Sequence, residues 1–183
     1  SAYTTVVITA VFSAYFVGAV AGNAPWATFA WTAAHSVSYA AILFTGPLVG
    51  AWADAHAAKK TLLLWTTAGC VVFTALLYYA APGAVALALV LVVLSNYFFG
   101  VGENLIAAFL PELADSRAFG RVSGWGWSFG YLGGLAALGI CLAYITASNA
   151  PASHTVPVSM LITAGFFVLA AVPSFVFLRE RAL

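Results

Sequence analysis

The chain has 183 residues, of which 64% are hydrophobic and only 6% are charged. A water-soluble domain carries roughly 25% charged residues, so this composition excludes a soluble domain and indicates a protein embedded in lipid. The net charge of +1 comes from six basic and five acidic residues. So few basic side chains exclude a nucleic-acid-binding protein.

Six long apolar stretches follow one another and predict an all-α membrane protein with six transmembrane helices. A span requires about 20 mostly apolar residues, and the runs lack the period-two alternation of membrane barrels. We expect Asn23 and Pro25 to close the first span, and Pro157 to close the connection before the last. The six form a single domain over residues 1–183. Their expected ranges are approximately 3–22, 36–53, 61–80, 86–110, 122–146 and 157–178.

The basic residues all lie on the same predicted side of the membrane, in every second connection and after the last span. One pair lies between the second and third spans, one pair lies between the fourth and fifth, and one pair follows the sixth: Lys59, Lys60, Arg117, Arg121, Arg179 and Arg181. Positive charge close to span ends is retained in the cytoplasm. The distribution therefore predicts a multi-pass protein of the bacterial inner membrane with both termini in the cytoplasm.

Glu103 is the one ionisable residue that we expect within a span. A carboxylate in hydrocarbon is costly, so its side chain should face protein or water. Asn104 follows it, and Asn96 lies seven residues earlier on nearly the same helical face. A structural hydrogen bond and a role in handling protons or solute are the two interpretations. The second is favoured, because ionisable residues within membranes usually mark transport pathways.

The first span carries hydroxyl residues that match this polar face. Thr5, Thr9 and Ser13 recur every four residues, a spacing that places them on one side of a helix. Such hydroxyls also bond to the carbonyls of their own helix, so a pathway role and a local role remain open.

Glycines give the fifth span its clearest packing signal. Gly126, Gly130 and Gly134 lie within the sequence GWGWSFGYLGG at residues 124–134. A stripe of small residues lets a neighbouring helix approach closely in lipid. Simple helix packing is the favoured interpretation, and a surface that slides during a conformational cycle is the alternative.

Motifs of covalent chemistry and of cofactor binding are not found in the sequence. The three histidines lie in or beside different connections, without the Cys/His spacing of a metal site. The sequence also lacks a phosphate-binding glycine loop and a nucleophile elbow. We therefore expect no catalytic residues, no metal and no cofactor.

Several stretches resemble the amino-terminal half of a major facilitator superfamily transporter. GAWADAHAAKKTLL (residues 50–63) resembles the superfamily's cytoplasmic loop motif of a glycine, an aspartate and a basic pair. The matching positions are Gly50, Asp54, Lys59 and Lys60. The resemblance implies that the aspartate caps and latches neighbouring helix ends. The arginine that usually follows the aspartate is Ala55 here.

Two further stretches are similar to the vacuolar-effluxer-like branch, which includes the autophagy-related amino-acid exporters. They are SAYTTVVITAVFSAYF (residues 1–16) and AFLPELADSRAFGRVSGWGWSFGYLGGL (residues 108–135). The resemblance implies secondary active transport by alternating access, with efflux of amino acids or similar small polar solutes. It also implies that the first and fourth helices line a central cavity, where Glu103 faces Thr5, Thr9 and Ser13.

A six-helix half of this superfamily is built from two inverted three-helix repeats and works with a second half. Besides the lipid bilayer and a small polar solute, the expected partner is therefore a second half. That half is the protein's own carboxy-terminal part, a second copy or another chain. The alternative function is a non-transporting structural or assembly subunit among other membrane subunits.

Overall fold

The structure is a computed structural model that describes residues 6–109 and 118–177. Within these ranges the chain forms helices joined by short turns. They are η1 (Ile8–Phe12), α2 (Ser13–Tyr15), η2 (Phe16–Val20), α3 (Ala27–Ala55), α4 (Lys59–Leu76), η3 (Leu77–Tyr79), α5 (Val85–Ala108), α7 (Phe119–Ala147) and α8 (Ala152–Phe177). We call the continuous segment η1–α2–η2 the first helix.

Five of the described helices are long and apolar enough to cross a membrane: α3, α4 with η3, α5, α7 and α8. The apolar part of the first helix, Ile8–Val20, is shorter. The structure therefore agrees with a helical membrane protein. Six complete spans remain a prediction, since a span requires about 20 residues.

Two helix boundaries differ from the expected ones. The helix after the first connection begins at Ala27 rather than near residue 36. Within the added turns the Thr32 hydroxyl donates to the carbonyl of Thr28, and the ring of Trp31 packs on that of Phe16, with the ring centroids 5.4 Å apart. Pro157 lies inside α8 rather than before it. Pro157 is the sixth residue of α8, so it removes only the one backbone hydrogen bond that an N–H there would donate to the carbonyl of Ser153.

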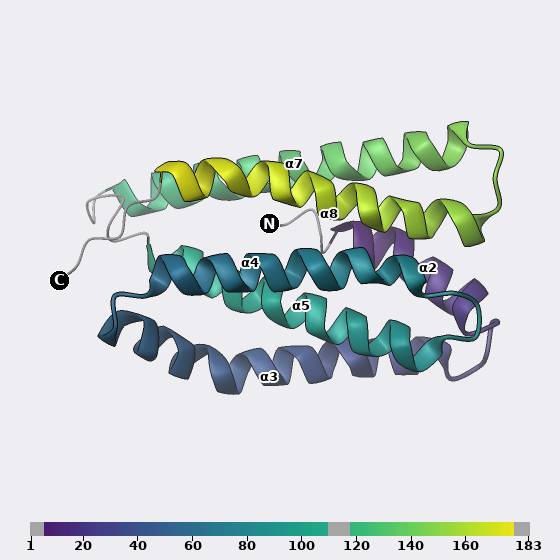
Figure 1. The fold of residues 1–183 in the computed structure, drawn as a ribbon, viewed down its shortest axis with the longest axis horizontal. Coiled ribbons are helices and arrows are strands. Elements are labelled where there is room, and N and C mark those ends of the chain that lie inside the picture. Colours follow the sequence, from purple (N-terminus) through teal and green to yellow (C-terminus); the bar gives the residue numbers. More distant parts are fainter. Residues whose placement is uncertain (1–5, 110–117, 178–183) are drawn as a thin grey trace.

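The helices run side by side, so the connections gather at two ends (Figure 1). The turn from α3 to α4 lies at the same end as the end of α5 and the start of α7. The basic residues Lys59, Lys60 and Arg121 therefore share one end, as the charge pattern predicts. Arg117, Arg179 and Arg181 lie outside the described residues, and the side of the membrane on which this end lies remains a prediction.

The helix α5 is the centre of the packing. It lies between α3 and α4, while α4 also contacts α8 and α7 packs mainly on α8. Close approach requires small residues: a Cβ at Gly69 of α4 would lie 2.8 Å from the ring of Phe98. At Gly100 of α5, a Cβ would overlap the side chain of Ile42.

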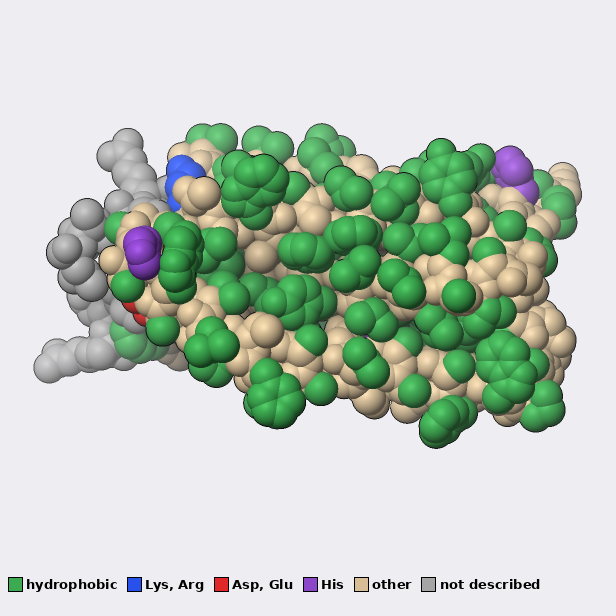
Figure 2. All heavy atoms as spheres, turned by 60° about the horizontal axis from the view of Figure 1, so that its bottom comes forward, with side chains coloured by type: hydrophobic (Ala, Val, Ile, Leu, Met, Phe, Trp, Pro, Cys, Tyr) green, Lys and Arg blue, Asp and Glu red, His purple; other side chains and the backbone are tan. Residues whose placement is uncertain are grey.

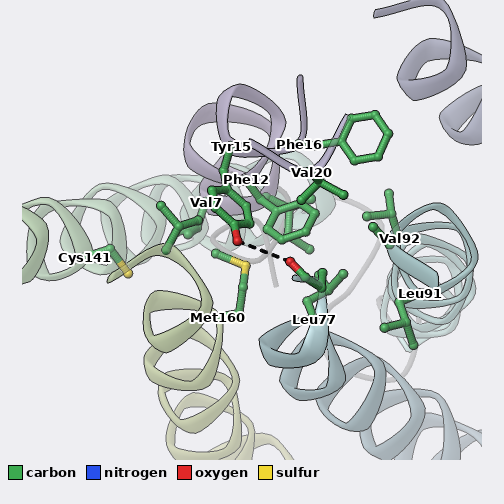
Figure 3. Close-up of a cluster of buried hydrophobic side chains, with 14 of the residues drawn as sticks. Val7, Phe12, Tyr15, Phe16, Val20, Leu77, Leu91, Val92, Cys141 and Met160 are labelled. Atoms are coloured by element: carbon green, nitrogen blue, oxygen red, sulfur yellow. Dashed lines mark hydrogen bonds between the residues drawn. The ribbon is translucent and has the colours of Figure 1, made fainter. Parts of the chain in front are cut away.

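The first helix and the residue before it bury Val7, Ile8, Phe12, Tyr15, Phe16 and Val20, and most of these side chains are seen in the core in Figure 3. Four of them, Ile8, Phe12, Phe16 and Val20, recur every four residues. A regular α-helix rotates by about 40° over four residues, so this spacing would drift off the core. The residues of η1 and η2 form wider, π-helical turns, which keep the buried face straight.

Apolar side chains cover the outside of the bundle along its length. Figure 2 shows hydrophobic side chains over one whole face, with the coloured charges near one end. Phe29, Leu43, Phe44, Leu48 and Leu169 are each at least 70% exposed. Such a surface is stable only against lipid or another apolar partner.

Candidate functional site

A hollow of about 260 Å³ lies between the first helix, α3, α5 and α7. We call it the central cavity. Its polar side chains are Thr9 of the first helix and Asn96 and Glu103 of α5. The structure thus brings together three of the residues that the sequence singled out, from two helices far apart in the sequence.

Glu103 is a half-buried carboxylate near one end of its helix. It lies five residues before the end of α5 at Ala108, or about 8 Å at 1.5 Å per residue. No hydrogen bond or ion pair joins its side chain to another residue in the described part of the chain. This carboxylate is therefore available to a proton, to water or to a solute.

Asn96 joins α5 to α3 within the core. Its Nδ2 donates a hydrogen bond of 2.7 Å to Oγ of Ser38, which is fully buried. Sequence reasoning missed Ser38, because a lone serine in an apolar run carries no signal until its partner is known. Asn96 therefore borders the central cavity and also holds two of its walls together.

The remaining pathway candidates lie elsewhere. The Ser13 hydroxyl donates to the carbonyl of Thr9, and Ser13 does not border the central cavity. Asn104 borders a separate hollow against α3, where its Nδ2 lies 3.1 Å from the position of a Cβ on Gly46. Thr5 lies outside the described residues.

Aromatic side chains form much of the remaining wall of the central cavity: Tyr39 of α3, Phe99 of α5, and Trp127 and Tyr131 of α7. Trp127 and Tyr131 are one helical turn apart, and the centroids of their rings are separated by 5.8 Å. Sequence reasoning did not single out these aromatic residues and missed this wall. The four-residue spacing of an indole and a phenol is the signal that points to it.

The loop motif forms an ion pair between two helix ends. Nζ of Lys59, at the start of α4, lies 2.9 Å from Oδ1 of Asp54, near the end of α3. The lysine side chain is 12% exposed and the aspartate side chain 62%. Gly50 lies one turn earlier and borders the hollow that contains Asn104. The contact joins α3 to α4 at the end where Lys60 also lies.

The glycine stripe of α7 is covered only in part by the described residues. A Cβ at Gly126 would have no neighbour within 4 Å, whereas Gly134 is buried with Ala137 and Cys141. Sγ of Cys141 lies 3.6 Å from Oγ1 of Thr163 on α8, so this end of the stripe turns towards α8. A packing role for Gly126 and Gly130 remains a prediction.

Groups of three or more His, Cys, Asp or Glu side chains suited to a metal do not occur among the described residues. The functional groups that line the central cavity are one carboxylate, one amide, the hydroxyl of Thr9 and several aromatic rings, two of which are the phenols of Tyr39 and Tyr131.

The chain is similar to a protein of Bacillus subtilis (strain 168) described as an uncharacterized MFS-type transporter, YxiO, with 30% identity over 178 residues. The match covers 93% of this chain and 40% of that protein, so the chain spans less than half the length of its relative. No protein-family model and no solved structure matches the chain. The likeness is to a transporter-type protein over the matched part, and together with the apolar helices it supports an integral, multi-pass membrane protein.

Proposed function

We propose that the chain is one half of a secondary transporter that moves small polar solutes by alternating access with a second six-helix half. The observation that carries this proposal is the central cavity, where a carboxylate, an amide and a hydroxyl meet inside an apolar bundle. Polar groups at membrane depth are costly and usually functional. The likeness to a transporter more than twice as long supports a missing second half.

The size and chemistry of the central cavity favour a small solute with a cationic group. Its volume of about 260 Å³ is below the roughly 300–1,000 Å³ of sites for drug-sized ligands. Glu103 supplies a negative charge for an ammonium group, and the faces of Trp127 and Tyr131 favour cations as well. Amino acids fit this description, in keeping with the resemblance to amino-acid exporters, and efflux is the direction we propose.

Glu103 is the proposed site of proton coupling. It is the described carboxylate that borders the cavity, and the other described acid, Asp54, is paired at a helix end. A group that alternately binds a proton and a cationic solute links the movement of one to the other.

Transport measurements on the intact protein in lipid vesicles test this proposal. Glu103→Gln keeps the shape of the side chain but removes the titratable proton, so we expect flux of an amino-acid mixture to lose its response to an imposed pH gradient. Asp54→Asn is the matched control and should retain that response. Unchanged pH-driven flux in Glu103→Gln would reduce Glu103 to a structural group. Absence of flux for every small solute would favour the assembly-subunit alternative.

The proposed orientation places the end that holds Lys59 and Lys60 in the cytoplasm. Ala55 and Ser153 are exposed residues near opposite ends of the bundle. In intact cells, a membrane-impermeant thiol reagent should label Ser153→Cys and leave Ala55→Cys unlabelled. The reverse pattern would invert the topology.

A further inference from the structure

Glu103 borders a second cavity as well as the central one. This second cavity, of about 60 Å³, lies between α4, α5 and α8, and we call it the lateral cavity. Its polar lining consists of Thr66 and Thr67 of α4, Ser174 of α8 and Glu103 itself. Neither α4 nor α8 borders the central cavity. The carboxylate therefore stands in the wall between two spaces lined by different helices.

The lateral cavity has the size and the polar groups to hold water. A cavity requires about 10–15 Å³ and two to four polar partners for each water molecule, so about 60 Å³ accommodates a short file. The Thr66 hydroxyl donates to the carbonyls of Leu62 and Leu63 at 3.0 and 3.1 Å, which leaves its oxygen free to accept. Thr67 and Ser174 make no hydrogen bond to another described residue, so both are available to water.

The position of the lateral cavity gives a short route to the charged end of the bundle. Ser174 lies three residues before the end of α8 at Phe177, and Thr67 lies eight residues after the start of α4 at Lys59. These separations are about 5 and 12 Å along the helices. A proton that entered at this end would cross only a small part of the bundle before it reached Glu103.

We propose that the lateral cavity is a water-filled proton path between Glu103 and the end of the bundle that holds Lys59, separate from the solute path in the central cavity. A proton passes from water at that end along waters held by Thr67 and Ser174 to an Oε of Glu103, and leaves by the reverse route. Only O–H bonds are exchanged. The role of this path in transport rests on the proposed function, whereas its existence does not.

The groups that face Glu103 are compatible with such a path. In the central cavity the titratable neighbours are Tyr39 of α3 and Tyr131 of α7, while Thr9 of the first helix and Val6 just before it complete the lining on that side. The residues of α4 and α8 that line the lateral cavity include no titratable or charged side chain. A proton in the lateral cavity therefore finds Glu103 as its one strong acceptor among the described lining residues.

Hydrogen exchange at the carboxyl group tests the path without any transport assay. In lipid-reconstituted protein at acidic pH, the infrared C=O band that disappears in Glu103→Gln reports Glu103, and its shift in heavy water gives the exchange rate. Thr67→Val combined with Ser174→Ala should slow this exchange by about tenfold or more, because the polar partners of the waters are lost. Thr32→Val combined with Ser36→Ala, hydroxyls that bond within α3, is the matched control and should exchange at the parent rate. An unchanged rate in the first double variant would overturn the proposal.

Thiol labelling gives a second reading if the double variant folds poorly. Ser174→Cys should react with a small water-soluble thiol reagent, whereas Leu169→Cys, at a 73% exposed position on the apolar surface of the same helix, should not. The native Cys70 and Cys141 are fully buried and give a low background. An unreactive Cys at position 174 in a folded protein would show that the cavity is dry and would also overturn the proposal.

Flux measurements separate this inference from the proposed function. If the protein transports a solute, the Thr67→Val and Ser174→Ala double variant should lose pH-driven accumulation and keep solute counterflow, which requires no net proton movement. Loss of both activities to the same extent would contradict separate paths. Absence of transport in the parent protein would reject the proposed function, and the exchange rate would still decide the proton path.

Discussion

The helices α5 and α7 are both long and apolar enough to cross a membrane, but they differ in how far the rest of the chain covers them. In the most apolar part of each helix, 39% of α5 residues are buried against 17% of α7 residues. α5 lies against α3 and α4, with the Asn96–Ser38 hydrogen bond inside that packing. α7 rests mainly on α8 and leaves Trp125 and Phe129 exposed.

The difference indicates which parts of the structure are complete within this chain. Exposed apolar side chains are satisfied by lipid, so they do not by themselves require a partner. An uncovered glycine is different, because small residues stabilise membrane helices chiefly by letting another helix approach. A Cβ at Gly126 would have no neighbour, whereas the space beside Gly69 is already occupied by the ring of Phe98. We therefore expect α5 and α4 to be stable in the chain alone, and α7 to gain most from the proposed second half.

Alanine at the two glycines gives the largest expected contrast. Gly69→Ala should destabilise the fold by up to about 2 kcal/mol, since overpacking costs roughly 1–3 kcal/mol and alanine returns about 1 kcal/mol of helix propensity. The ring of Phe98 cannot easily move aside, because it stacks on the ring of Phe73 with the two centroids 5.5 Å apart. Gly126→Ala should be neutral or slightly stabilising. Unfolding of both variants in mixed detergent micelles measures the difference, and equal destabilisation would mean that α7 is covered as tightly as α4.

The buried hydrogen bond between α3 and α5 should give the next largest effect. Ser38→Ala leaves the Asn96 amide without its partner and should cost about 0.6–2 kcal/mol, the range measured for hydrogen bonds between membrane helices. Ser36→Ala, two residues away on the same helix, removes a hydroxyl that bonds only within α3 and should be nearly neutral. The same micelle assay compares the two. A neutral Ser38→Ala would imply that Asn96 finds another partner.

The ion pair at the end of α3 should give the smallest effect. Asp54→Asn should cost less than about 1 kcal/mol, because the aspartate is mostly exposed and such pairs are weak and screened by salt. Thermal stability in detergent at low and high ionic strength measures the loss, which should shrink as salt is added. A large, salt-independent loss would instead indicate that Asp54 caps a helix through the backbone.

The sequence allowed a detailed prediction of the helices and a partial one of the site. Long apolar runs predicted the helices because a span has a fixed minimum length, and Glu103 was identifiable because charge is rare at that depth. The start of α3 at Ala27 and the inclusion of Pro157 in α8 were missed, since helix ends depend on local hydrogen bonds that periodicity does not record.

The site residues likewise include some that the sequence predicted and some that it could not. Asn96 and Asn104 are equivalent as residue types beside Glu103, yet they border different hollows. Only the packing of α3 against α5 distinguishes them. Tyr39 and Trp127 were missed because an aromatic residue in an apolar helix is ordinary until the opposite wall is known.

The wide turns of the first helix have a consequence for insertions and deletions. Each π-helical turn holds one residue more than an α-turn between its hydrogen-bonded groups. Removal of one residue there, for example Gly18 in η2, converts the wide turn to an ordinary one and leaves the direction of the flanking side chains nearly unchanged. The same deletion in the middle of α7, which is α-helical throughout, rotates everything on one side of it by about 100°. Chain length is therefore more freely variable in the first helix than in α7.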